Sequence, residues 1–286
     1  ESLKKLLETE DLDPPARAAA IGTILSVGNP PELRDYGLDT KRFTRSGKYD
    51  PRQHAAALER LLEVSHLRKA RPEGNLAQLL GPLVADRNPQ LRAAALRLVG
   101  AWNVDQLGPQ VLAVAKEQTL PVVVRAAAME TMAGMELPAA EKVLLAAASA
   151  SQPAPLRSAA VQSLAGLDIQ AAATQAVTLF MDKQLEKADA RITLKAVLGR
   201  DGGAEALAGA LQTTPLDAEA ARRLLEALFA SGRFDAPLVS VLGQAIGTAR
   251  IAPEYDQGYV KKLAAGAGHD GKADRGALIF KAMACA

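Results

Sequence analysis

A short phrase recurs along this chain and limits what it can fold into. Each copy has a proline, an arginine three or four residues later, two or three small residues and then an aliphatic run, most clearly after Pro89, Pro121 and Pro153. Fainter copies extend the series, and the anchoring arginines are Arg17, Arg92, Arg125, Arg157, Arg191 and Arg222. From Arg92 onward they are spaced by 33, 32, 34 and 31 residues. A fixed period of this length is typical of solenoids, in which each helix pair buries its apolar face against its neighbours.

The residues around the phrase predict where its helices begin and end. Proline suits the first helical turn, because its φ is preset and the amide hydrogen it lacks would be unpaired there. Asp86 and Asn88 precede Pro89 and are expected to cap the exposed N–H groups of that helix. Three copies close on a glycine, which predicts a left-handed residue at the helix end. These glycines are Gly100, Gly134 and Gly166.

Composition agrees with a helical repeat. Hydrophobic residues make up 49% of the chain and aromatic residues only 3%, and alanine is the most frequent residue. Alanine favours helices over strands, so an all-β fold is excluded. We predict an all-α fold, a right-handed α-solenoid of about 6–8 helix pairs over residues 1–252. The second helices of the pairs are expected at roughly 105–118, 138–150, 169–183, 203–213 and 236–248.

The repeated phrase resembles the short bacterial form of the HEAT repeat, whose pattern is Asp-x-x-Pro-x-Val-Arg-x-x-Ala-Ala-x-Ala-Leu-Gly. The resemblance covers about 86 to 250 well and the flanks loosely. It implies that the arginines pair with aspartates of adjacent repeats, of which Asp86, Asp105, Asp168 and Asp189 are available. It implies no single function, because such solenoids have many unrelated roles. The expected structural ladder consists of Arg92, Arg125, Arg157 and Arg191.

The interval from Arg17 to Arg92 is longer than two repeats, and we place the surplus in an irregular insert at about 35–51. This insert lacks helical periodicity and holds aromatic residues in an aromatic-poor chain. Two interpretations stay open: its aromatics pack on adjacent helices, or the insert is a contact surface for a partner. The residues concerned are Tyr36, Arg42, Phe43, Arg45 and Tyr49.

Charge and motifs indicate no reaction. Lys and Arg number 34 against 32 for Asp and Glu, spread evenly, so nothing favours nucleic-acid binding. No apolar stretch is long enough to span a membrane. His54, His66 and His269 lack metal-ligand spacing and are expected to be ordinary surface or partly buried histidines. We therefore predict no catalytic residue and no metal site. A HEAT-type DNA glycosylase, using Trp102 and Asp105, and a bilin lyase remain alternatives.

The last residues, 271–286, resemble the first helix of a class I cytochrome c. Gly276 and Phe280 match the glycine and aromatic residue of that helix, and Cys285 matches the first cysteine of the haem-attachment motif C-x-x-C-H. Residues 253–270 would then be a connector. The resemblance implies no haem in this fragment and haem c in a longer parent. The alternative is that Cys285 is an incidental thiol.

A HEAT array followed by a cytochrome c start resembles large exported proteins, frequent in planctomycetes and their relatives. These have a β-propeller sugar-dehydrogenase-like domain, HEAT repeats and a C-terminal haem domain. The resemblance implies a noncatalytic scaffold that positions the haem domain against other protein domains, outside the cytoplasm. Because the chain begins Glu1-Ser2 without an initiator Met or signal peptide, we expect a fragment or matured product. A free-standing protein-binding scaffold is the alternative.

Overall fold

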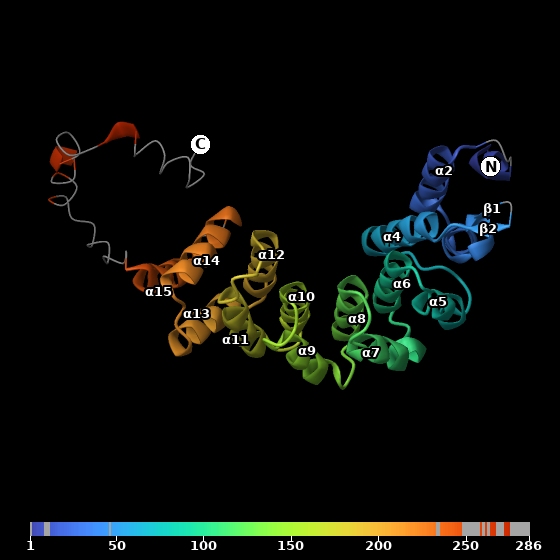
Figure 1. The fold of residues 1–286 in the computed structure, drawn as a ribbon. Coiled ribbons are helices and arrows are strands. Elements are labelled where there is room, and N and C mark those ends of the chain that lie inside the picture. The colour runs from blue at the N-terminus through green and yellow to red at the C-terminus, as the bar shows by residue number, and fades with distance from the viewer. Residues whose placement is uncertain are drawn as a thin grey trace. The chain divides into compact units, whose positions relative to one another are not determined.

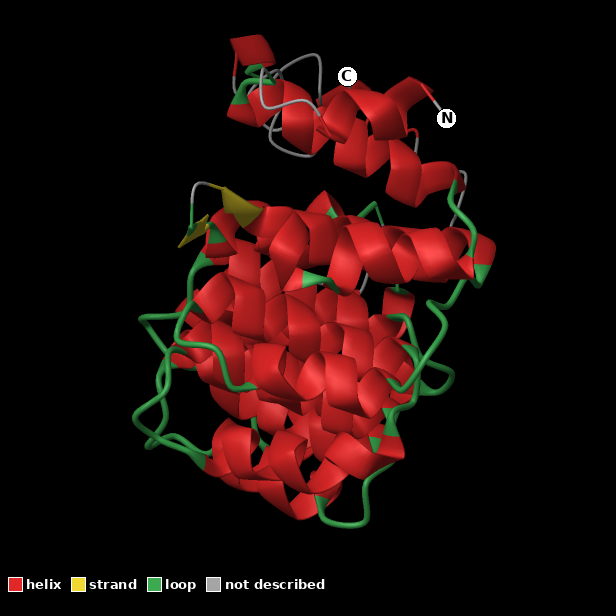
Figure 2. Cartoon of the chain, turned by 90° about the vertical axis from the view of Figure 1, so that its right-hand side faces the viewer, coloured by secondary structure: helices red, strands yellow, loops and turns green. Residues whose placement is uncertain are grey.

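The computed structural model describes residues 2–8, 12–45, 47–232, 235–247, 258, 261, 264–266 and 272–274. These residues are mostly helical and include almost no strand, which confirms the all-α prediction (Figure 2). Within them, the strands are the short antiparallel pair β1 (Thr44–Arg45) and β2 (Lys48–Tyr49). The chain forms two compact units, Glu1–Ala148 and Ser149–Ala286.

In the first unit, four longer helices lie side by side in chain order, α2 next to α4, α4 next to α6, and α6 next to α8 (Figure 1). The shorter helices α5 and α7 pack against α6 and α8 respectively. Between α3 and α4 the chain makes a π-helical turn, η1 (Arg34–Leu38), a 3-10 turn, η2 (Thr40–Phe43), and the β1–β2 hairpin. The helices are α1 (Ser2–Glu8), α2 (Pro14–Val27), α3 (Pro30–Leu33), α4 (Pro51–Arg68), α5 (Leu76–Val84), α6 (Pro89–Ala101), α7 (Gly108–Lys116), α8 (Val122–Gly134) and α9 (Ala140–Ala148), with a further 3-10 turn, η3 (Asp105–Leu107).

In the second unit, each helix packs beside the helix two places further along the chain. Helix α12 lies between α10 and α14, while α13 lies between α11 and α15. The second helices expected from the sequence are present here as α11, α13 and α15, and in the first unit as α7 and α9. The helices of this unit are α10 (Ala154–Leu164), α11 (Ile169–Phe180), α12 (Lys187–Leu198), α13 (Gly203–Thr213), α14 (Ala218–Ala230) and α15 (Ala236–Ile246).

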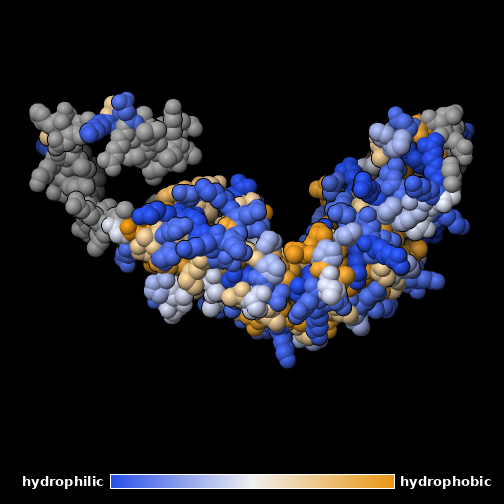
Figure 3. All heavy atoms as spheres, in the orientation of Figure 1, coloured by the Kyte–Doolittle hydropathy of each residue, from blue (hydrophilic) through white to orange (hydrophobic). Residues whose placement is uncertain are grey.

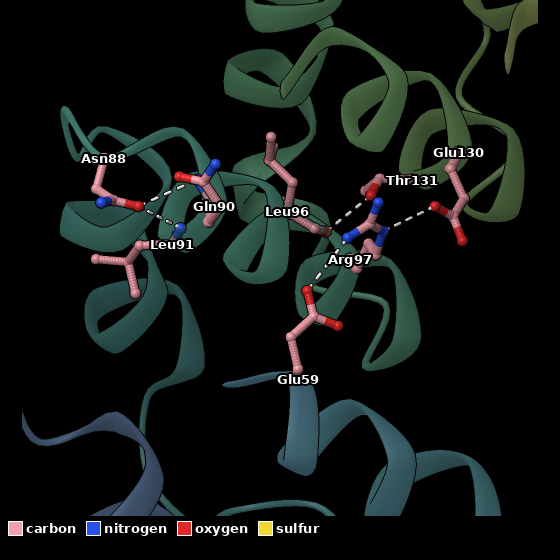
Figure 4. Close-up of polar contacts among 8 residues, drawn as sticks. All are labelled: Glu59, Asn88, Gln90, Leu91, Leu96, Arg97, Glu130 and Thr131. Carbon is pink, nitrogen blue, oxygen red and sulfur yellow. Dashed lines mark hydrogen bonds and ion pairs between the residues drawn. The ribbon is translucent and has the colours of Figure 1, made fainter. Parts of the chain in front are cut away.

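The predicted cap of α6 is confirmed. The side-chain oxygen of Asn88 accepts hydrogen bonds from the backbone N–H groups of Gln90 at 3.1 Å and Leu91 at 3.0 Å (Figure 4). Asp86 in turn accepts from the N–H of Asn88 at 2.7 Å. These bonds satisfy donors that have no partner inside the helix, so the start of α6 is specified locally.

Small residues let the neighbouring helices approach closely. Ala94 and Ala95 in α6 are fully buried, as are Ala127 and Ala128 in α8. At Gly100 a Cβ atom would lie 3.3 Å from the Cα of Thr131 in α8, which is tighter than ordinary packing. The alanine-rich phrase therefore places its small side chains where helix meets helix.

The predicted left-handed glycines are wrong. Gly100 and Gly134 remain inside α6 and α8, and the positive φ angles that follow these helices belong to Asn103 (47°) and Glu136 (51°). The close contact with Thr131 gives Gly100 a packing role instead.

The face drawn in Figure 3 carries mostly hydrophilic residues, with smaller hydrophobic areas between them. Across the described part of the chain, every helix is too short or too polar to cross a bilayer.

Candidate functional site

His54, near the start of α4, is the residue over which the insert folds. Its imidazole is completely buried. Nε2 lies 3.0 Å from the carbonyl oxygen of Gly37, and Nδ1 lies 2.8 Å from the hydroxyl of Tyr49. The ring of Phe43 stacks on the imidazole with centroids 4.1 Å apart and planes 10° apart. Because a carbonyl oxygen only accepts, Nε2 carries the hydrogen, and Nδ1 of the neutral ring accepts from the Tyr49 hydroxyl.

Burial also sets the protonation states of this cluster. It lowers the pKa of His54 to about 4, against opposing contributions from the Gly37 hydrogen bond and from Asp86 and Asp39. Burial raises the pKa of Tyr49 to about 12, with help from Asp86 and Asp50. Both groups are therefore neutral at pH 7, and they hold the insert on α4 by neutral hydrogen bonds.

The expectation that His54 is an ordinary surface or partly buried histidine is wrong, because the insert folds over it. A signal was present in the sequence. His54 precedes Leu58 by four residues and Leu61 by seven, so it belongs to the apolar stripe of α4.

The insert residues differ in whether they pack on adjacent helices or face a partner, the two interpretations left open by the sequence. Tyr36 and Phe43 are buried, with 5% and 4% of their surface exposed, so most of each ring packs inside the protein. Arg42 is half-buried and its guanidinium lies 4.5 Å from the centre of the Tyr36 ring, a cation–π contact. Tyr49 is half-buried on His54, while Arg45 is exposed. Burial therefore favours the packing interpretation for Tyr36 and Phe43.

A cavity of about 480 Å³ opens between this hairpin and the first turns of α2 and α4. The described residues that line it include Pro14, Phe43, Tyr49 and Pro51, and among them one carboxylate, that of Asp50. We call it the basic pocket because five cationic side chains line it: Arg17, Arg42, Arg45, Lys48 and Arg52.

Arg42 and Arg45 were predicted from the sequence as contact residues, whereas Arg17, Lys48 and Arg52 were not. A usable signal was the spacing of basic residues through the insert, at 42, 45, 48 and 52. Arg17 could not be found this way, because it belongs to α2 and reaches the pocket only through folding.

Arg17 ties α1 and the insert to α2. Its guanidinium donates to the carbonyl oxygens of Leu7 at 3.0 Å and Arg42 at 3.3 Å. Burial lowers the pKa of Arg17, and the charges of Arg45 and Arg42 lower it further. The cations are therefore close enough to repel one another, which is the electrostatic condition for attracting an anion.

Comparisons with protein-family models, with curated proteins and with solved structures found no match.

Two arginines of the predicted ladder, Arg157 and Arg125, contact other groups than the aspartates expected as their partners. Arg157 is buried and its Nη1 lies 2.7 Å from Oδ2 of Asp182, just past the end of α11. Arg125 is buried and its Nε donates to the carbonyl of Ala115, in the last turn of α7. Arginines that reach the ends of neighbouring helices stabilise their unpaired carbonyls and negative dipole ends.

The other two predicted arginines differ. Arg92 is half-buried, whereas Arg191 is exposed. In α14 the arginine that reaches the end of a neighbouring helix is Arg223. It donates to the carbonyl oxygens of Phe180 at 3.3 Å and Asp182 at 3.2 Å, at the end of α11. Two of the aspartates expected as partners, Asp86 and Asp168, accept backbone N–H groups at helix starts.

A second cavity, of about 380 Å³, lies between α12 and α14. Alanines on both helices leave it open, and Lys187 and Glu226 form an exposed ion pair of 3.4 Å at its edge. Its apolar walls could accept an apolar group but offer no reacting atoms. They consist of Phe180, Leu185, Ala188, Ala190, Ala220, Leu224, Ala227 and Ala230.

Of the remaining predicted residues, Trp102 lies in the described part of the chain. Trp102 is buried, with 4% of its surface exposed, so it is not positioned to stack on a flipped base beside Asp105. Within the described residues, no three His, Cys, Asp or Glu side chains gather as metal ligands would. Gly276, Phe280, Cys285 and His269 lie outside the described residues.

Proposed function

We propose that the chain is a noncatalytic α-solenoid scaffold of HEAT-like helix pairs that holds protein domains in fixed positions. The observation that carries this proposal is the place of the repeated phrase in the fold. Its copies begin α6 and α8 in one unit and α10, α12 and α14 in the other. Within each unit, these helices pack against one another in chain order.

The polar contacts support the same function, because they join each helix to its neighbours. Arg97 in α6 donates to Glu59 in α4 at 3.3 Å and to Glu130 in α8 at 3.1 Å (Figure 4). The Thr131 hydroxyl of α8 donates to the Leu96 carbonyl of α6 at 2.8 Å. In repeat proteins, stability comes from such nearest-neighbour interfaces, which leave the outer surfaces available for binding.

Small-angle X-ray scattering tests the solenoid. A compact chain of 286 residues would have a radius of gyration of about 19 Å. We expect a clearly larger value at several protein concentrations, with a distance distribution that has an extended tail. A radius of gyration near the compact value would contradict the proposal.

In the setting we propose, the scaffold positions a C-terminal c-type haem domain in a larger exported protein that transfers electrons. Support comes from the order Gly276, Phe280, Cys285, which resembles the start of a cytochrome c. The genomic reading frame provides the test. We expect Cys and His at the third and fourth positions after Cys285, as C-x-x-C-H requires. Other residues there would leave the free-standing protein-binding scaffold as the function.

A further inference from the structure

We propose that the basic pocket is a binding site for an acidic segment of a partner protein. The proposal concerns the insert and the first turns of α2 and α4 alone, so it does not require the repeat architecture or a haem domain.

The charges of the pocket indicate an anionic ligand. Five cations line it against the carboxylate of Asp50, which already accepts the N–H groups of Arg52 at 3.0 Å and Gln53 at 3.2 Å. Asp13 and Asp39, at neighbouring turns, likewise accept the N–H groups of Ala16 and Lys41. These hydrogen bonds hold the three carboxylates at the turns that they cap, and within the described lining of the pocket the cations still outnumber the carboxylate of Asp50. A ligand with several negative charges would relieve the repulsion among the cations that Arg17 experiences.

The frame of the pocket is fixed before any ligand arrives. The Phe43 ring is stacked on His54, and Tyr49 is hydrogen-bonded to the same imidazole. Arg42 is held over Tyr36, while Arg17 donates to the Arg42 carbonyl. A rigid wall reduces the conformational entropy that binding would otherwise cost.

The backbone geometry favours a peptide carrying carboxylates over a single phosphate. Helix starts bind phosphate through free N–H groups. Here both helices begin with a proline, Pro14 and Pro51, and the next donors are capped by Asp13 and Asp50. Recognition therefore falls to side chains, of which Lys48 and Arg52 are exposed. Arg45 is also exposed, and its guanidinium already donates to the carbonyl oxygen of Leu12 at 2.8 Å.

The five cations of the pocket come from η2, from the β1–β2 hairpin and from the first turns of α2 and α4. They therefore match negative charges that are spread along an extended segment. The cavity of about 480 Å³ is large enough for several side chains. An acidic peptide offers several carboxylates at this spread, whereas one phosphate group concentrates its charge at a point.

Fluorescence anisotropy with the full chain tests the proposal. The probe is a fluorescein-labelled peptide of about ten alternating Asp and Glu residues, long enough to span several cations. We expect saturable binding that weakens as salt is raised from about 50 to about 500 mM. The variant Arg45→Glu/Arg52→Glu should weaken binding at least tenfold. Inorganic phosphate, at the same concentration of charge, should compete poorly.

The matched control is Lys116→Glu/Lys142→Glu, which makes the same charge change at two exposed positions of the same unit. It should bind the peptide within about twofold of the unchanged chain, which is about 0.4 kcal/mol. Equal losses in the two double variants, or no saturable binding, would overturn the proposal. A single-stranded oligonucleotide that binds more tightly than the peptide would overturn it in favour of nucleic acid.

Circular dichroism melting checks that the variants fold. If Arg45→Glu/Arg52→Glu melts early, Lys48→Gln/Arg52→Gln replaces it, and unchanged binding by that pair overturns the proposal. The scattering experiment on the solenoid is independent of these results, so the two proposals fail separately.

Discussion

The hydroxyl of Tyr49 donates a 2.8 Å hydrogen bond to Nδ1 of His54, and this bond requires the imidazole to be neutral. Protonation at Nδ1 would turn the acceptor into a donor and place a charge where no solvent reaches it. The fold of the insert is therefore linked to pH through one buried side chain.

We expect stability to fall with pH between the two pKa values of His54. The unfolded residue titrates near pH 6.5 and the folded one at about 4, so over this range the unfolded chain binds more protons. The free energy of unfolding should decrease as the pH is lowered through this range, by about 3 kcal/mol in total. Urea unfolding at intervals between about pH 7 and pH 5, above most carboxylate titrations, measures it.

The variant His54→Gln keeps polar groups but does not titrate, so its stability should be lower at pH 7 and nearly level down to pH 5. His66→Gln, on the exposed side of α4, should keep the slope of the unchanged chain. If the free energy of unfolding of His54→Gln still falls as the pH is lowered, the pH dependence belongs to other groups.

Two glycines of α13 should respond in opposite ways to alanine. At Gly203 a Cβ would lie 2.0 Å from the carbonyl oxygen of Val197, which belongs to the backbone and cannot move aside cheaply. We expect Gly203→Ala to cost about 2 kcal/mol or more. At Gly209 nothing lies within 4 Å of the added atom, so Gly209→Ala should stabilise the helix by about 0.5–1 kcal/mol. Shifts of the urea midpoint in opposite directions are the expected result.

The parts of the fold that were predictable are those specified by neighbouring residues. The start of α6 follows from Asn88 and Pro89, because the cap, the proline and the helix are contiguous in sequence. The same holds for the row of helices that begin with the repeated phrase.

The parts that were missed depend on residues brought together by folding. His54 is buried because Gly37, Phe43 and Tyr49 fold over it from an irregular segment. Arg17 joins the basic pocket from a different helix. The glycine prediction failed for a related reason: the local rule for helix ends competes with the packing of Gly100 against Thr131, which only the folded chain reveals.

The contact between α6 and α8 should depend on the hydroxyl of Thr131. It is buried and donates to the Leu96 carbonyl, so Thr131→Val keeps the shape but removes the bond. We expect a loss of about 1 kcal/mol in the free energy of unfolding. The control is Thr174→Val, because the exposed Thr174 hydroxyl bonds only within its own helix, to Gln170. Equal effects in both variants would show that the interhelical bond contributes nothing of its own.

The alanines of α14 offer a test of the cavity next to α12. Ala227 lines this cavity, so Ala227→Leu has room for the larger side chain and buries additional apolar surface. We expect it to stabilise the chain by about 0.5–1 kcal/mol. Ala221 is fully buried on the same helix but does not line the cavity, so Ala221→Leu should overpack the core and cost about 1–3 kcal/mol. Melting temperatures of the two variants should move in opposite directions, and a loss of stability in Ala227→Leu would mean that the space between α12 and α14 closes in solution.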